Sequence, residues 1–135
     1  MPELTLAQSR KLTDLAEEKA REIDIAVCIA VVDRGGHLFS LQRMDGAFLG
    51  SIEVAHKKAK TAVYFPMSTA TFGDAVRAGQ LTGMELGNGG LMCFPGGVPI
   101  RQAEQQVGAI GISGGTAAQD EIIAMYALEK AGFAL

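Results

Sequence analysis

Hydrophobic residues in the first part of the chain return every three or four positions, which is the period of one face of an α-helix. Just before this pattern, Thr5 and Gln8 have the spacing of a capping box, in which each side chain binds the other residue's backbone N–H. We therefore predict a first helix that begins near Thr5 and ends at about Glu22. Its apolar face consists of Leu12, Leu15, Ala16, Ala20 and Ile23.

The helical period occurs again further along the chain. Ser51 is suited to cap a second helix, which Pro66 ends, and a short helix is predicted at residues 71–78. A second capping box, Thr116 with Gln119, begins the last helix, which stops at Gly132. The side chains predicted to face inward from this last helix are Ile122, Met125 and Tyr126.

Short hydrophobic runs separated by glycine-rich turns predict antiparallel strands. Residues 26–32 are apolar at every position, which indicates a strand covered on both faces. In the return strand, period two places His37, Phe39, Leu41 and Arg43 on one side. The predicted strands are 26–32, 37–43, 91–94, 98–101 and 106–113. The predicted fold is therefore α/β (α+β), with a five-strand antiparallel sheet and helices on both faces.

Composition narrows the class of protein. The 135 residues suit a single domain, 1–135, and the formal net charge of −3 comes without any basic block, which argues against nucleic-acid binding. No uninterrupted apolar stretch of about 18 residues is present, so no membrane span is predicted. The two cysteines, Cys28 and Cys93, have no metal-binding spacing, and Cys28 is predicted to be a buried, inert thiol. We expect a cytoplasmic protein.

The stretch GISGG, residues 111–115, precedes the last helix and has several interpretations. It matches the G-x-S-x-G pattern of a nucleophile elbow, but the chain has only two histidines to act as a base. A tight corner is the simplest alternative, with Ser113 binding local backbone groups. A third interpretation is that free N–H groups at the start of the helix bind a ligand carboxylate.

Few side chains have a pattern that indicates chemistry. Glu53 and His56 have the i, i+3 spacing found in carboxylate-bridged metal sites, and either His37 or His56 is able to bind haem iron or a metal. Arg43 offers a planar fork to a carboxylate or phosphate, or pairs with Asp45 at the surface. Lys58 borders an apolar helical stripe, where it either extends to solvent or projects into a pocket.

Four motifs carry a family resemblance: VVDRGGHLFSLQRMDGA, HKKAKTA after Ser51, FPGGVPI and QQVGAIGISGG. In this order they resemble the GlcG/HbpS-like family, which includes haem-binding uptake proteins and the PduO C-terminal-like domain of cobalamin adenosyltransferases. Within the family, they are most similar to the OrfY-like proteins of glycerol and diol dehydratase operons. The resemblance spans nearly the whole chain.

The resemblance implies a profilin-like sandwich that forms a homo-oligomer, a tetramer or an octamer. It also implies haem binding or a role in cobalamin metabolism. In relatives the haem ligand has been assigned to a histidine near the first helix, and this chain has no histidine before His37. Its ligand must then be His37, His56, a methionine or Tyr64. Of the matched motif positions, Arg43, Lys58 and Ser113 are expected to touch a ligand.

Three hypotheses follow. The first is a non-catalytic accessory protein that binds haem, a corrinoid or a related tetrapyrrole. In the second, an enzyme holds a small carboxylate metabolite with Arg43 and the last helix, while His56 or Lys58 moves protons. The third is a structural assembly partner, whose oligomer surface is the working part.

Overall fold

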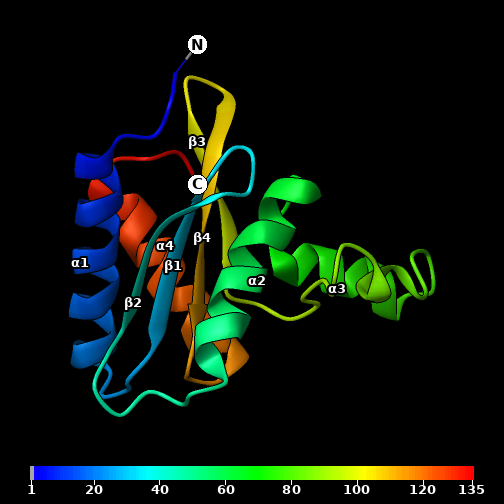
Figure 1. Cartoon of the computed structure of the whole chain (residues 1–135), viewed down its shortest axis with the longest axis horizontal. Coiled ribbons are helices and arrows are strands. Elements are labelled where there is room, and N and C mark those ends of the chain that lie inside the picture. Colours follow the sequence, from blue (N-terminus) through cyan, green and yellow to red (C-terminus); the bar gives the residue numbers. More distant parts are fainter. Residues whose placement is uncertain (1) are drawn as a thin grey trace.

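A four-stranded antiparallel sheet lies between two helical layers in the computed structural model, which describes residues 2–135 (Figure 1). The strand order is β2-β1-β4-β3, so β1 and β4 are central. Helices α1 and α4 cover one face and α2 covers the other. The elements in chain order are α1 (Leu6–Glu22), β1 (Cys28–Asp33), β2 (Leu38–Arg43), α2 (Ser51–Tyr64), α3 (Thr69–Arg77), the 3₁₀ turn η1 (Met84–Leu86), β3 (Gly97–Gln102), β4 (Gln105–Ser113) and α4 (Ala117–Ala131).

Strand β1 supplies side chains to two separate cores, because successive residues of a strand point to opposite faces. Ile29 and Val31 are buried against α1 and α4, whereas Ala30 and Val32 are buried against α2. Its predicted burial on both faces is confirmed. Cys28 is also confirmed as a buried free thiol, and burial raises its pKa.

The sheet has four strands, so the predicted five-strand sheet is wrong. Residues 91–94 do not form a strand, because their backbone groups bind helices and a turn instead of a neighbouring strand. The Met92 N–H donates to Thr61 Oγ1, 3.0 Å away, and the Cys93 carbonyl accepts from Arg77 at 2.8 Å. Figure 1 shows that α3 and the segment after it extend away from the sheet, beyond α2.

Both predicted capping boxes are present, at Thr5 and at Thr116. The predicted cap at Ser51 is wrong: Gly50 precedes the helix without a side-chain cap, and the Ser51 hydroxyl binds Ser113. The inward face predicted for α4 is wrong at Ile122, which is 50% exposed, whereas Met125 is partly buried against the core. The residues that α4 buries in the core are Ile123, Ala124, Ala127 and Leu128.

The alternation predicted for the second strand is interrupted by an irregularity in the pairing of β1 with β2, between Val31 and Val32. Phe39 packs against the core beneath α1 and α4. Leu41 pairs with Ala30, whose side chain faces α2. Phe39 and Leu41 therefore lie on opposite faces, and their predicted common side is wrong.

Candidate functional site

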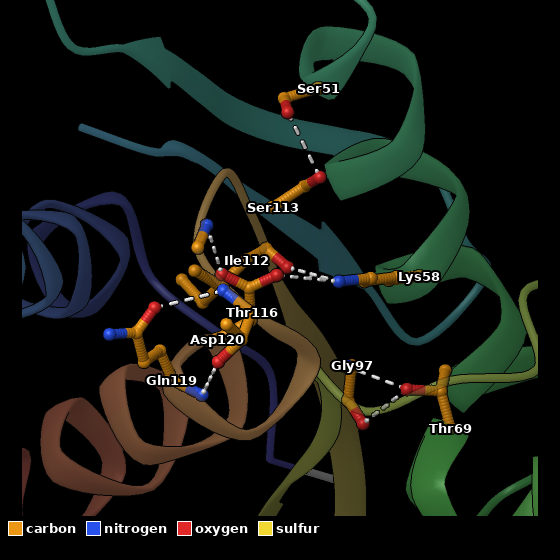
Figure 2. A network of polar contacts seen from close by, with 10 residues as sticks. Ser51, Lys58, Thr69, Gly97, Ile112, Ser113, Thr116, Gln119 and Asp120 are labelled. Atoms are coloured by element: carbon orange, nitrogen blue, oxygen red, sulfur yellow. Dashed lines mark hydrogen bonds and ion pairs between the residues drawn. The ribbon is translucent and has the colours of Figure 1, made fainter. Parts of the chain in front are cut away.

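The residues that the sequence singles out lie in two different environments, a buried polar network at the start of α4 and an open cleft at the β1–β2 turn. In the network, Lys58 extends from α2 toward the end of β4 (Figure 2). Its Nζ donates to the Ile112 carbonyl at 2.8 Å and lies 3.0 Å from Asp120 Oδ2. The side chain is 0% exposed, so no ligand reaches it from solvent.

Lys58 is a charged group whose partners are all inside the protein. Besides Ile112 and Asp120, the ring of Phe94 lies 4.7 Å from its Nζ. Burial lowers the pKa of Lys58, and the neighbouring Asp120 carboxylate partly offsets that effect. The side chain therefore neither extends to solvent nor projects into a ligand pocket, and it ties α2 to β4 and α4.

Asp120 is the polar residue of this network that sequence reasoning missed as a site residue. Its Oδ1 accepts the Gly115 N–H at 2.8 Å, while its Oδ2 faces Lys58. The capping box uses the N–H groups of Thr116 and Gln119. The carboxylate of Asp120 thus occupies the position near the helix start that the sequence suggests for a ligand carboxylate. An acidic residue in the first turn of a helix was the available signal.

The GISGG stretch forms a tight corner between β4 and α4. Gly114 has a φ of +146°, and a Cβ at this position would lie 2.5 Å from the Ala26 carbonyl oxygen. Ser113 is buried and its hydroxyl donates to Ser51 Oγ at 3.1 Å (Figure 2). The serine is thus bonded to another serine rather than to a histidine, which is not the arrangement of an activated nucleophile.

Glu53 and His56 do not form a metal site with other side chains of the described residues. Glu53 pairs with Lys57 at 2.8 Å on the exposed side of α2. The Nε2 atom of His56 is buried without a hydrogen-bond partner among the described residues, and burial, reinforced by the charge of Lys60, lowers the pKa of the imidazole. Within residues 2–135, no three His, Cys, Asp or Glu side chains gather to hold a metal ion.

Arg43 lies at the exposed end of the edge strand β2, opposite Cys28 on β1. Its partners in the enzyme hypothesis are in different surroundings: Lys58 is enclosed by protein, and His56 is partly covered on α2. A substrate bound to exposed Arg43 would have no access to the Lys58 ammonium group. The geometry therefore gives Lys58 no role as a proton carrier for that substrate.

His37 lines an open cleft of about 330 Å³ beside the β1–β2 turn. Its side chain is 82% exposed, and its Nδ1 lies 3.3 Å from Asp33 Oδ1. The cleft combines apolar side chains, one imidazole, one guanidinium and two carboxylates. Its lining residues are Glu3, Leu4, Asp33, Arg34, Gly35, His37, Phe39 and Val107. Of the five side chains predicted to bind a cofactor, this cleft contains His37.

A family model described as "Haem degrading protein HbpS-like" matches residues 4–129. The crystal structure of the Klebsiella pneumoniae protein ORFY has a TM-score of 0.93 and 40% identity, covering 97% of this chain and 92% of that one. The structure of the PduOC:heme complex has a TM-score of 0.94 and 33% identity, covering 98% of both chains. Corrinoid adenosyltransferase PduO of Salmonella typhimurium is 35% identical over 93% of this chain, which spans only 38% of that protein.

Proposed function

The chain belongs to the HbpS-like family, and from that premise we propose that it is a tetrapyrrole-binding accessory protein whose ligand is haem and which catalyses no reaction itself. The observation that carries the proposal is the similarity, along nearly the full length of both chains, to a protein whose structure is a haem complex. That relative shares a third of its residues with this chain, and the TM-score of 0.94 means that the two backbones are closely similar.

The chemistry of the cleft at His37 fits such a ligand. A haem has a flat apolar macrocycle, an iron that takes nitrogen ligands, and two carboxylates at its edge. Leu4, Phe39 and Val107 provide apolar surface, His37 provides an imidazole, and Arg34 provides a cation. The volume of the cleft is at the lower end of the range for small-molecule sites, which suits partial enclosure of a large ligand.

The non-catalytic part of the proposal is supported by the internal bonds of the reactive groups. Lys58, Asp120 and Ser113 are all buried and all bonded to protein atoms. They form a structural network at one end of the sheet. These three side chains are therefore engaged in holding the fold, whereas the groups that line the cleft are suited to binding.

A corrinoid is the second ligand candidate, because one relative is named as a corrinoid adenosyltransferase. This chain spans 38% of that protein, so the named activity of the whole protein belongs to a much longer chain. Corrinoids and haem share a planar tetrapyrrole and a metal with axial positions. The two ligands are therefore compared in one experiment.

We further propose that the protein acts in the cytoplasm as a homo-oligomer and as an accessory to a cofactor-dependent pathway. Phe48 and Leu49, adjacent in the loop before α2, are 72% and 74% exposed, and exposed apolar side chains that lie together mark a surface that another molecule covers. Among the described residues, no helix is both long enough and apolar enough to cross a membrane.

The test is an absorption titration of the purified chain with hemin and, separately, with cobalamin. A saturable shift of the hemin Soret band at one haem per chain or per pair of chains supports the proposal, and a shift with cobalamin alone changes the ligand to a corrinoid. The complex is then incubated with a reductant and oxygen. Loss of the Soret band faster than for haem bound to serum albumin would overturn the non-catalytic part.

A further inference from the structure

We propose that His37 is the axial ligand of the bound haem, through its Nε2 atom, and that Asp33 is the residue that positions its imidazole. This inference rests on the proposed function and adds the site and its ligating atom. His37 follows the β1–β2 turn and its ring is largely in solvent at the mouth of the cleft. An iron is therefore able to approach the ring without displacing the core.

The turn places the imidazole beside a carboxylate. Asp33 Oδ1 accepts the backbone N–H of Gly35 at 2.8 Å and that of His37 at 2.9 Å. The same oxygen lies 3.3 Å from His37 Nδ1. Histidines that bind metals commonly present one ring nitrogen to a carboxylate, which fixes the tautomer, makes the other nitrogen a better ligand and directs it toward the metal. In His37 that other nitrogen is Nε2.

Gly35 gives the ring room to lie close to the backbone. A Cβ at Gly35 would lie 2.8 Å from His37 Cε1 and 2.9 Å from His37 Nδ1, closer than atoms of these kinds approach without moving. Gly35 is not in the left-handed region, so alanine fits its backbone conformation. Gly35→Ala therefore displaces the imidazole while leaving the turn allowed, which makes it a direct probe of ring position.

Arg34 is available for a carboxylate of the ligand. Its Nη2 lies 3.3 Å from Glu3 Oε1 in an ion pair whose two side chains are both exposed. Exposed pairs of this kind contribute little to stability, so the guanidinium can exchange its partner at small cost. Its planar fork suits a haem propionate. Arg34 and His37 lie on the same cleft, one for the edge of the macrocycle and one for its iron.

His56 is the matched control, because it is the only other histidine in the chain. Its Nε2 is buried, so an iron reaches that atom only if the atoms that cover it move. His37 and His56 are thus the same chemical group in opposite settings, one open and oriented and one covered. Replacing each by alanine separates ligation by His37 from non-specific adsorption of haem.

The experiment compares the absorption and electron paramagnetic resonance spectra of hemin bound to the wild type, His37→Ala, Asp33→Asn, Gly35→Ala and His56→Ala. His37→Ala should lose the histidine-ligated spectrum, and added imidazole should restore it. Asp33→Asn keeps an oxygen for the turn but loses the charge at Nδ1, so haem affinity should fall about 10-fold and the iron reduction potential should rise. Gly35→Ala should weaken binding, and His56→Ala should match the wild type.

The outcomes separate the inference from the function on which it rests. If the wild type shows no saturable Soret shift, the proposed function fails. If the wild type binds and His37→Ala gives an identical spectrum and affinity, the proposed function stands and this inference is wrong. Circular dichroism and thermal unfolding test whether His37→Ala is folded, as the high exposure of His37 predicts.

Discussion

Lys58 shows how far sequence reasoning reaches for a single residue. The helical period places it at the edge of an apolar stripe, and from there extension to solvent and projection into a pocket are equally compatible with the sequence. Its true partners are the Ile112 carbonyl and Asp120, 54 and 62 residues away. Only the fold brings them together, because no local pattern encodes a bond between helices on opposite faces of a sheet.

The Lys58–Asp120 pair gives a prediction for stability. Lys58→Met leaves the nearly buried carboxylate of Asp120 without its cation, so the free energy of unfolding should fall by about 3–5 kcal/mol. Lys57→Met, one residue earlier, breaks an exposed pair with Glu53 and an exposed hydrogen bond to the Gly89 carbonyl, and should cost about 1 kcal/mol. Urea denaturation measures both values. Equal losses in the two variants would contradict the structural role of Lys58.

The double variant Lys58→Met/Asp120→Asn sharpens that test. It removes both charges, so the penalty of an uncompensated buried ion disappears along with the attraction. The double variant should therefore lose less stability than the sum of the two single variants, as a double-mutant cycle measures. Additive losses would mean that the two side chains act independently.

His56 predicts a pH dependence whose sign follows from its surroundings. Burial and the charge of Lys60 lower its pKa below the ordinary value of 6.5. Above 6.5 the imidazole is neutral in both states. As the pH falls below 6.5, the imidazole of the unfolded chain takes up a proton before that of the folded chain. The free energy of unfolding therefore decreases until the pH has passed the lower pKa of the folded state.

The pH effect of His56 is measured as a difference between two proteins. His56→Gln keeps a polar side chain without the titration, so carboxylate titrations common to both proteins cancel. The urea midpoint of the wild type should fall further than that of His56→Gln between pH 7.5 and pH 5. If His56→Gln had the same pH profile as the wild type, protonation of His56 would not be a cause of the loss of stability.

At the scale of elements, local signals in the sequence are sufficient to predict where helices begin. They are not sufficient to predict every buried helix face or every strand. The two capping boxes identified where α1 and α4 begin, because the bonds involved lie within four residues. The sequence does not predict the full buried face of α4, because residues 122–128 are apolar nearly all the way round and their period favours no single face. The structure buries Ala124 and Ala127 there, beside α1.

The false strand at residues 91–94 has a different cause. A short apolar run before a Pro-Gly-Gly turn has the pattern of half a hairpin. Its N–H and carbonyl groups instead find partners on α2, α3 and the segment between α3 and β3, such as Thr61 and Arg77. A sequence pattern indicates that backbone N–H and carbonyl groups need partners. It does not indicate that side chains of distant helices supply them.

The close packing of α2 on the sheet predicts a strict requirement for glycine at position 111. A Cβ on Gly111 would lie 2.0 Å from the Ala55 carbonyl oxygen and 2.7 Å from the Ala59 nitrogen, both in the backbone of α2. Gly111→Ala must push the helix off β4, and we expect it to cost about 1–3 kcal/mol or more. Gly50→Ala has open space around its new methyl group and should be nearly neutral.

Thermal and urea unfolding of the two glycine variants measure this requirement. The pair is matched in chemistry, since each adds one methyl group at a glycine outside the left-handed region. A large loss confined to Gly111→Ala would show that the distance between helix and sheet is set by this contact. A Gly111→Ala protein as stable as Gly50→Ala would mean that α2 moves freely on the sheet.

At the scale of the whole molecule, the polar network and the cleft lie at separate places, so stability and binding rest on different residues. The network joins α2, β4 and α4. The cleft is built from the β1–β2 turn, from β4 and from the residues that precede α1. Ligand variants such as His37→Ala are therefore expected to leave the fold intact. The sequence supplied the histidine of the cleft, but its grouping with Leu4 and Val107 depends on tertiary structure.

The exposed apolar surface of the molecule carries the last prediction. Phe48 and Leu49 lie exposed in the loop between β2 and α2, and Leu41 of the edge strand β2 is also partly exposed. Association of copies through this surface would remove the apolar side chains from water and cover the open edge of β2.

Light scattering after size exclusion should give four or eight times the mass of one chain. Phe48→Ser/Leu49→Ser should lower that mass, whereas Leu86→Ser, which changes an equally exposed leucine on the segment that extends beyond α2, should not. A single-chain mass for the wild type would contradict self-association, and a loss of mass in Leu86→Ser alone would move the interface to that segment.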